Sequence, residues 1–207
     1  EMLEKFSLGY SFEESNHFSK IAIAKGYKTD NLINAGLISS KNDRTYDRFR
    51  GRVMFPIHNI SGRVIGFGAR ILQINKKIAK YLNSPETDIY HKSHVLYGLH
   101  LAKRAMIQKN NCFLVEGYTD VISFHQKEIE NVVSSSGTSL TTGQIKLIKR
   151  FTNNITVLYD GDAAGIKASF RGIDLILKEG MNVKVISFPD GEDPDSFAQK
   201  NTTTELE

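Results

Sequence analysis

From residue 112 onwards the chain alternates between short apolar runs and longer amphipathic segments, and this alternation limits the folds open to it. The apolar runs have the length of buried strands, and the segments between them repeat apolar residues at helical spacing. Strands and helices that alternate in this way form a parallel sheet covered by helices. We predict strands at residues 112–115, 131–134, 155–159 and 183–188, and helices at 118–127, at 142–151 and from 163.

The first half of the chain has a different pattern. A Ser-x-x-Glu spacing from Ser11 is typical of a capping box at a helix start, and an alternation of period two after Arg48 is typical of a strand. This half is predicted to contain helices over 12–25 and 29–35, a strand over 48–57 with a hairpin partner over 62–70, and a helix near 97–109.

Together these patterns predict an α/β fold class, in which an α+β N-terminal subdomain precedes a subdomain with a mostly parallel sheet covered by helices. The predicted N-terminal subdomain spans residues 1–109, the second spans 110–200, and a polar tail spans 201–207. The chain begins without methionine, and we expect it to be a piece excised from a longer protein.

The cysteine content and the length of the apolar runs indicate the redox environment of the protein and whether it spans a membrane. The one cysteine, Cys112, excludes an internal disulfide and a zinc site built from Cys-x-x-Cys pairs, and fits a reducing, intracellular setting. No apolar run approaches the roughly 20 residues of a membrane span. We therefore expect a soluble, cytoplasmic protein with no membrane partner.

Charge is distributed unevenly along the chain. Residues 41–104 contain 13 Lys and Arg against 4 Asp and Glu, a net charge of +9, whereas residues 112–200 contain 9 against 12, a net charge of −3. A basic surface beside a carboxylate pocket suits an enzyme that holds a polyanion and metal ions. An ordinary solvated charge imbalance explains the same numbers equally well.

Acidic residues follow three of the predicted strands, where each strand ends. They are Glu116 and Asp120 after the first strand, Asp160 and Asp162 after the third, and Asp190, Glu192, Asp193 and Asp195 after the fourth. The carboxyl ends of parallel strands meet at one edge of a sheet, where carboxylates repel one another unless cations neutralise them. Oxygen ligands favour magnesium, manganese or calcium over zinc. The pattern therefore predicts a divalent metal site and phosphoryl chemistry.

Each acid also has an ordinary structural explanation. Asp162 could cap the helix at 163, Asp160 could belong to a turn with Gly161, and Asp120 could pair with a basic residue of its own helix. Taken singly, these explanations are the more frequent ones. Three clusters at strand ends, beside a segment of strong positive charge, favour the metal site.

Three arginines, Arg48, Arg50 and Arg52, lie at period two and would share one face of the predicted strand. Such a stripe can follow the phosphates of single-stranded DNA without reading its sequence. An edge strand kept soluble by positive charge is the alternative. We favour the DNA-binding interpretation, because three arginines exceed what solubility requires.

Several motifs resemble a known family. The runs at 115–122, 159–165 and 189–195 are similar to the signature of the Toprim domain, which primases, topoisomerases and some nucleases share. The runs at 48–57, 66–70, 80–87 and 91–93 resemble the DNA-binding half of the catalytic core of DnaG-type replicative primases. The motifs cover nearly the whole chain in the family's order, so the chain is identified as a fragment of such a core.

The resemblance implies synthesis of short RNA primers on a single-stranded DNA template from ribonucleoside triphosphates, with Mg²⁺ or Mn²⁺ as cofactor. It assigns catalysis to Glu116, Asp160 and Asp162, with Glu116 as a metal ligand or as the base for the nucleophile. The implied metal ligands are Glu116, Asp120, Asp160, Asp162, Asp193 and Asp195. The implied nucleotide- or primer-binding residues are Arg70, Lys80, Asn83 and Lys92.

The resemblance also implies parts that this chain lacks. Family members carry zinc in a domain ahead of this core, and a C-terminal domain binds the replicative helicase. We expect a monomer that acts at the bacterial nucleoid and, as a fragment, synthesises primers poorly. Two rival functions remain, a Toprim nuclease or topoisomerase fragment and a non-catalytic module that binds single-stranded DNA.

Overall fold

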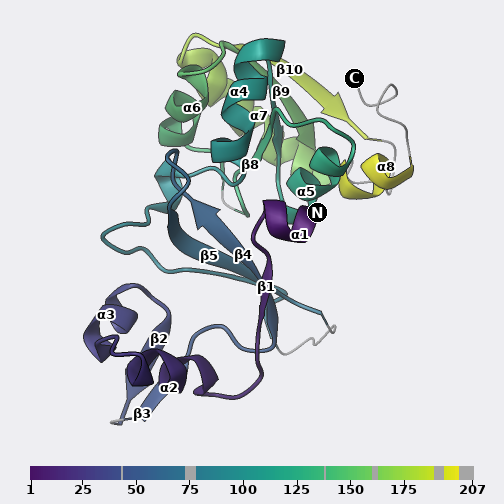
Figure 1. The fold of residues 1–207 in the computed structure, drawn as a ribbon. Coiled ribbons are helices and arrows are strands. Elements are labelled where there is room, and N and C mark those ends of the chain that lie inside the picture. Colours follow the sequence, from purple (N-terminus) through teal and green to yellow (C-terminus); the bar gives the residue numbers. More distant parts are fainter. Residues whose placement is uncertain (43, 73–77, 138, 160–162, 189–193, 201–207) are drawn as a thin grey trace. The chain divides into compact units, whose positions relative to one another are not determined.

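The computed structural model describes residues 1–200 except 43, 73–77, 138, 160–162 and 189–193 (Figure 1). The chain folds into two compact units. The first comprises Glu1–Ile57 and Arg63–His91, and the second comprises His58–Gly62 and the chain from Lys92 onwards. None of the helices in the described ranges is long and apolar enough to cross a membrane.

The first unit is built around a four-stranded sheet with strand order β1-β4-β5-β6. Strand β1 pairs antiparallel with β4, and β5 pairs antiparallel with β6. A separate antiparallel pair, β2 and β3, lies with the two short helices α2 and α3 (Figure 1). The elements are α1 (Met2–Lys5), β1 (Gly9–Ser11), α2 (His17–Ala24), α3 (Thr29–Asn34), β2 (Ile38–Lys41), β3 (Arg44–Asp47), β4 (Arg52–His58), β5 (Val64–Ile71) and β6 (Tyr81–Asn83).

The predicted start of the first long helix is wrong. Helix α2 begins at His17, whereas Ser11, the predicted cap, ends strand β1 and exchanges hydrogen bonds with the backbone of Arg52. The exposed N–H groups at the helix start are instead satisfied from a distant strand. The buried Asp47 carboxylate accepts from Phe18 N at 2.6 Å and from Ser19 N at 2.9 Å. Capping by a residue about 30 positions later is invisible to local sequence patterns.

Other predictions for this unit hold more closely. The short helix expected at 29–35 is α3, and Gly36 ends it with a positive φ of 68°. A side chain at Gly36 would also meet Pro85 at 2.5 Å, so both the conformation and the packing require glycine. The strand expected at 48–57 begins only at Arg52, because Gly51 turns the chain with a φ of 58°.

The second unit has the predicted parallel sheet, with strand order β10-β9-β7-β8 and all three pairings parallel. Its fold class is α/β as expected. The elements are the 3-10 turn η1 (Lys92–His94), α4 (Leu99–Lys109), β7 (Cys112–Val115), α5 (Tyr118–Gln126), β8 (Val132–Ser134), α6 (Thr142–Lys149), β9 (Asn154–Tyr159), α7 (Ala163–Lys178), β10 (Asn182–Ser187) and α8 (Pro194–Lys200).

Helices cover both faces of this sheet. One face packs on α4, α6 and α7 through a core that includes Met106, Leu114, Ile145 and Ile176. On the other face Phe113 meets Phe124 of α5, with 6.1 Å between ring centroids, and α8 packs on α5. Burial of both faces explains why β7, β8 and β9 read as nearly continuous apolar runs, whereas the edge strand β10 is largely exposed.

The turn between β4 and β5 and the whole of α4 belong to the second unit. Lys103 of α4 donates to Ile60 O at 3.1 Å, and the His58 and His100 rings lie 4.2 Å apart. Residues 92–109 therefore pack with the parallel sheet, although the sequence places the subdomain boundary at 109. The exact boundary stays a prediction.

Candidate active site and nucleic-acid interface

Glu116 stands at the carboxyl end of β7. In the register of β7 and β9, Leu114 lies opposite Val157, and the same register extended by two residues sets Glu116 level with Tyr159. Ser187, the last residue of β10, lies opposite Tyr159. The ends of three strands thus meet at one edge of the sheet, where the sequence predicted the acids to converge.

Asp120 lies at the start of the helix that follows Glu116. Its buried carboxylate accepts a hydrogen bond from Gly117 N at 2.8 Å and so satisfies one of the free N–H groups at the helix start. A negative charge at this end is also favourable for the helix dipole. Asp120 therefore has a structural role in α5, whatever its role toward a metal ion.

Asp195 belongs to α8 but is held by α5. Ser123 donates to Asp195 Oδ1 at 2.5 Å, and Gln199 donates to the same oxygen at 2.8 Å. This contact ties the segment after β10 to the helix that begins next to Glu116. It brings together residues that are 72 positions apart in the sequence.

Three predicted ligands, Asp160, Asp162 and Asp193, lie outside the described residues and stay predictions. Among the residues that the structure does describe, no group of three His, Cys, Asp or Glu side chains could hold a metal ion. The predicted donor set consists only of carboxylates, which is the chemistry that Mg²⁺ and Mn²⁺ prefer.

A cavity of about 280 Å³ opens beside Glu116 at this edge of the sheet. The loop after β8 forms one wall, and Gly137 N donates to Glu116 O at 3.3 Å. Arg171, an exposed residue of α7, also lines the cavity. The sequence analysis did not predict Arg171, because only the apolar residues of its helix were used to predict that helix.

In the first unit, Arg48, Arg50 and Arg52 line one groove of about 540 Å³. Arg50 is exposed, whereas Arg52 is only 5% exposed and donates to the carbonyls of Ala79 and Lys80 at 2.9 and 3.2 Å. Arg48 and Arg50 precede strand β4, so the three arginines share this groove but do not form one face of a strand as predicted. The buried guanidinium of Arg52, however, already holds the segment before β6 in place.

The Arg48 side chain also makes a hydrogen bond within the protein, since its Nη2 donates to Asn83 O at 3.1 Å. Burial lowers the pKa of Arg48 and Arg52 from 12.5. An arginine begins so far above neutrality that both remain charged. The groove is therefore lined by three positive charges and one acid, Glu13, and Arg50 is the most accessible of the arginines.

Two more predicted residues gather around one aromatic ring at the same sheet. The guanidinium of Arg70 lies 5.6 Å from the ring centroid of Tyr81, and the ammonium of Lys80 lies 5.8 Å from it. Asn83 pairs with Gly68 across β5 and β6. The first unit thus brings together the arginines and three of the predicted nucleotide-binding residues.

Lys92, the fourth residue predicted to bind the nucleotide or primer, begins the turn η1 in the second unit. Gln144 fixes the backbone of that turn. The fully buried Gln144 side chain donates to Lys92 O at 3.1 Å and to Val95 O at 2.9 Å. Thr141 donates to Ser93 O at 2.6 Å and accepts from Gln144 N, as in a capping box. This cap therefore fixes the turn that contains Lys92.

Comparisons with known proteins agree with this geometry. Residues 1–103 match the family described as DNA primase catalytic core, N-terminal domain, and residues 113–198 match the family described as Toprim-like. A solved DnaG primase catalytic domain bound to single-stranded DNA is 40% identical, with a TM-score of 0.87 over 99% of this chain and 67% of that chain. The chain belongs to the DnaG primase family.

Two other members of the primase family show what share of a relative's length this chain covers. A DNA primase from Clostridium acetobutylicum is 47% identical over 199 residues, which are 96% of this chain and 33% of the relative. The zinc-binding and RNA polymerase domains of the Aquifex aeolicus primase give a TM-score of 0.92 at 36% identity, over 99% of this chain and 50% of that chain. The chain spans about a third of the length of the curated relatives. The resemblance to the primase core is confirmed.

Proposed function

We propose that this chain is the catalytic part of a primase that synthesises RNA primers on single-stranded DNA from ribonucleoside triphosphates. The observation that carries the proposal is the convergence of three parallel strand ends at Glu116, in a chain whose two halves match the two parts of the primase core. Toprim relatives imply a divalent metal in general. We propose Mg²⁺ or Mn²⁺, because the donors are carboxylates.

The ligands of the metal ions would be Glu116, Asp120, Asp160, Asp162, Asp193 and Asp195. When bound, the ions would supply positive charge at the attacking oxygen and at the leaving pyrophosphate. Asp195 is already oriented by Ser123, and Asp120 by Gly117 N, so these two carboxylates would need little rearrangement. The preorganised contacts support the proposal, since a site held in place avoids reorganisation during the reaction.

Glu116 is proposed to take the proton of the primer 3′-hydroxyl, or to serve as a ligand. The oxygen of that hydroxyl forms a bond to the α-phosphorus of the incoming nucleotide, and the bond from this phosphorus to the bridging oxygen breaks to release pyrophosphate. A carboxylate at a strand end can reach a substrate held in the adjoining cavity. Arg171, in the same cavity, would attract the anionic substrate.

The basic residues are proposed to bind the polyanions. Arg48 and Arg50 would contact template phosphates, with Arg52 supporting the groove from below. Arg70, Lys80 and Asn83 would hold the triphosphate or the nascent primer, and so would Lys92. The partners are then a DNA template, ribonucleotides and an RNA primer, in the cytoplasm of a bacterium, with a helicase and zinc bound by other domains of the whole protein. We propose that the chain is a monomer.

The experiment that tests this function compares the chain with Asp160→Ala/Asp162→Ala on a primed single-stranded template, with ribonucleotides and Mg²⁺ or Mn²⁺. A primed template is used so that the assay measures extension alone. Primer extension that needs the metal and disappears in the double variant supports the proposal. Extension that persists in the variant, or cleavage of the template without nucleotides, refutes it.

A further inference from the structure

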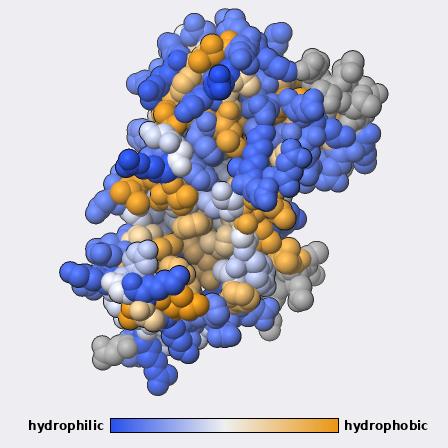
Figure 2. Space-filling model, in the orientation of Figure 1, coloured by the Kyte–Doolittle hydropathy of each residue, from blue (hydrophilic) through white to orange (hydrophobic). Residues whose placement is uncertain are grey.

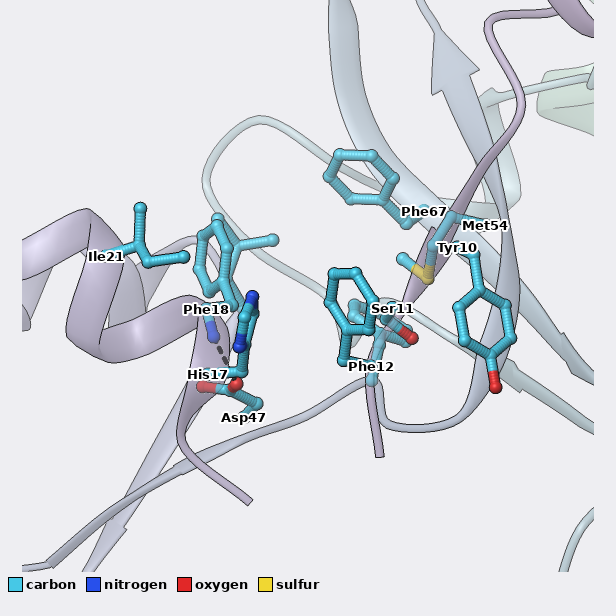
Figure 3. Close-up of a pocket in the computed structure, with 11 residues that line it drawn as sticks. Tyr10, Ser11, Phe12, His17, Phe18, Ile21, Asp47, Met54 and Phe67 are labelled. Carbon is cyan, nitrogen blue, oxygen red and sulfur yellow. Dashed lines mark hydrogen bonds between the residues drawn. The ribbon is translucent and has the colours of Figure 1, made fainter. Parts of the chain in front are cut away.

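The first unit contains a second hollow, distinct from the arginine groove and almost entirely apolar. Its volume is about 320 Å³, and it lies between helix α2 and the strands β1, β4 and β5 (Figure 3). Figure 2 shows apolar residues gathered on this part of the first unit. Most of the lining is aromatic, with side chains from Tyr10, Phe12, His17, Phe18, Phe49 and Phe67.

Three of these aromatic side chains are well exposed. Phe12 is 58% exposed, Tyr10 47% and Phe18 41%. A cluster of exposed aromatic rings around one hollow marks a binding surface, because leaving such rings in water is unfavourable. The rings already contact one another: Phe12 lies 4.6 Å from His17 and 6.2 Å from Tyr10, between ring centroids.

Hydrogen bonds and ring contacts hold the walls of this pocket. The buried Asp47 carboxylate lines the pocket and accepts a hydrogen bond from Phe18 N (Figure 3). It also accepts one from Ser19 N and so fixes the first turn of α2. On the strand side, the Phe49 and Phe67 rings meet at 6.2 Å in an edge-to-face arrangement. A ligand would therefore enter an aromatic slot whose walls are held by hydrogen bonds and ring contacts.

The slot adjoins the arginine groove. Tyr10 lines both hollows. Phe49 lines the slot, whereas its neighbours Arg48 and Arg50 line the groove, and the Arg48 guanidinium lies 6.0 Å from the Phe49 ring centroid. Cations that suit phosphates thus stand one residue away from rings that suit an aromatic ligand.

We propose that the slot accepts one unpaired base of a DNA strand whose phosphates lie along Arg48 and Arg50. Stacking on aromatic side chains next to a positive groove is how proteins bind single strands regardless of sequence. The lining is almost entirely apolar, so the slot selects a flat ring and not a particular base. This inference rests on the proposed function, since it adds a base subsite to the template strand.

The charge around the slot favours a nucleic acid over a protein as its occupant. The groove beside the slot is lined by three arginines, Arg48, Arg50 and Arg52, against one acid, Glu13. An apolar side chain of a partner protein would need the aromatic rings but not the guanidinium groups beside them. A base attached to a phosphate backbone uses both.

The experiment measures binding of fluorescently labelled single-stranded DNA to the whole chain, to Phe12→Ala and to Tyr27→Ala. Tyr27, 61% exposed and not part of the slot, is the matched control, and Phe12→Tyr keeps the ring. Phe12→Ala should weaken binding roughly 5- to 100-fold, as expected for the loss of one stacked base, while the other two variants bind like the unaltered chain. Both Phe12 and Tyr27 are exposed, so neither substitution should unfold the unit.

A second measurement moves a single abasic residue along the DNA. At one position the missing base should weaken binding to the unaltered chain and have no further effect on Phe12→Ala. Equal affinity of Phe12→Ala and Tyr27→Ala for every strand overturns the inference and leaves the slot to a protein side chain. If Phe12→Ala loses affinity while the unaltered chain extends no primer, the proposed function fails and the subsite stands. If the unaltered chain extends the primer and Phe12→Ala binds DNA as tightly as the unaltered chain, the proposed function stands and the subsite fails.

Discussion

Replacing Gln144 with alanine should destabilise the second unit and disturb the position of Lys92. The substitution removes the donors to Lys92 O and Val95 O and the acceptor for Thr141 N, all inside a fully buried site. Each buried hydrogen bond contributes about 1 kcal/mol net, so the three together contribute about 3 kcal/mol. The better helix propensity of alanine returns only a few tenths of a kcal/mol.

Urea unfolding of the chain measures this loss, with Gln108→Ala as the control, because Gln108 is an exposed glutamine of helix α4. The Gln144→Ala variant should lose about 3 kcal/mol and the control less than about 0.5 kcal/mol. Equal stability of the two variants would refute the assignment of Gln144 as a clamp on the turn.

The clamp also has a functional consequence. If Lys92 holds the nucleotide, Gln144→Ala should raise the KM for ribonucleotides more than it lowers kcat, because the lysine is displaced but the carboxylates are not. In a Lys92→Ala background the same substitution should change KM little, since the group that it positions is gone. Additive effects on KM in the double variant would show that Gln144 does not act through Lys92.

Three further predictions follow from single contacts. Burial, then the neighbouring His58 and Lys103, lowers the pKa of His100 to about 4, so the unfolded chain binds more protons between pH 4 and 6.5. Stability should therefore fall as the pH falls through this range, and less so in His100→Gln, as measured by urea midpoints. Gly36→Ala should cost more than about 1 kcal/mol in the same assay, given its positive φ and the contact with Pro85. Arg50→Ala should weaken DNA binding regardless of sequence and reduce the salt slope by about 0.7, unlike Arg44→Ala outside the groove.

The second unit was predictable because its signals are local. Strand β7 coincides with the predicted run 112–115. Strands β8 and β9 differ from their predicted ranges by one residue at the start, and β10 is shifted by one residue at both ends. Strands β7, β8 and β9 are mostly buried, so their apolar runs are nearly continuous, and the exposed edge strand β10 keeps an apolar sequence around Lys184. The alternation with helices then leaves a parallel sheet as the natural arrangement.

The first unit was harder to predict because its elements depend on distant contacts. Helix α2 starts where Asp47 can cap it, and Ser11 is drawn into strand pairing with Arg52. The hairpin of β2 and β3 has two buried residues, Ile38 and Asp47, which pair with each other at its open end, and it gives almost no alternating pattern. Tertiary context therefore decided these boundaries.

The candidate site was predictable in its residue types and only partly in its contacts. Glu116 directly follows strand β7, and the short apolar run that forms this strand is visible in the sequence. The bond from Ser123 to Asp195 and the use of Arg52 as a backbone donor join segments far apart in the sequence. No spacing rule reports such partners, so they emerge only from the folded chain.

The central claim is template-directed RNA synthesis, and nucleotide choice on a defined template tests it most directly. The chain, Mg²⁺ or Mn²⁺ and a primed strand of thymidine residues would be supplied with one ribonucleotide at a time. The account predicts extension with ATP alone, and its loss in Asp160→Ala/Asp162→Ala. Extension with every nucleotide alike, or cleavage of the strand in place of extension, would contradict it.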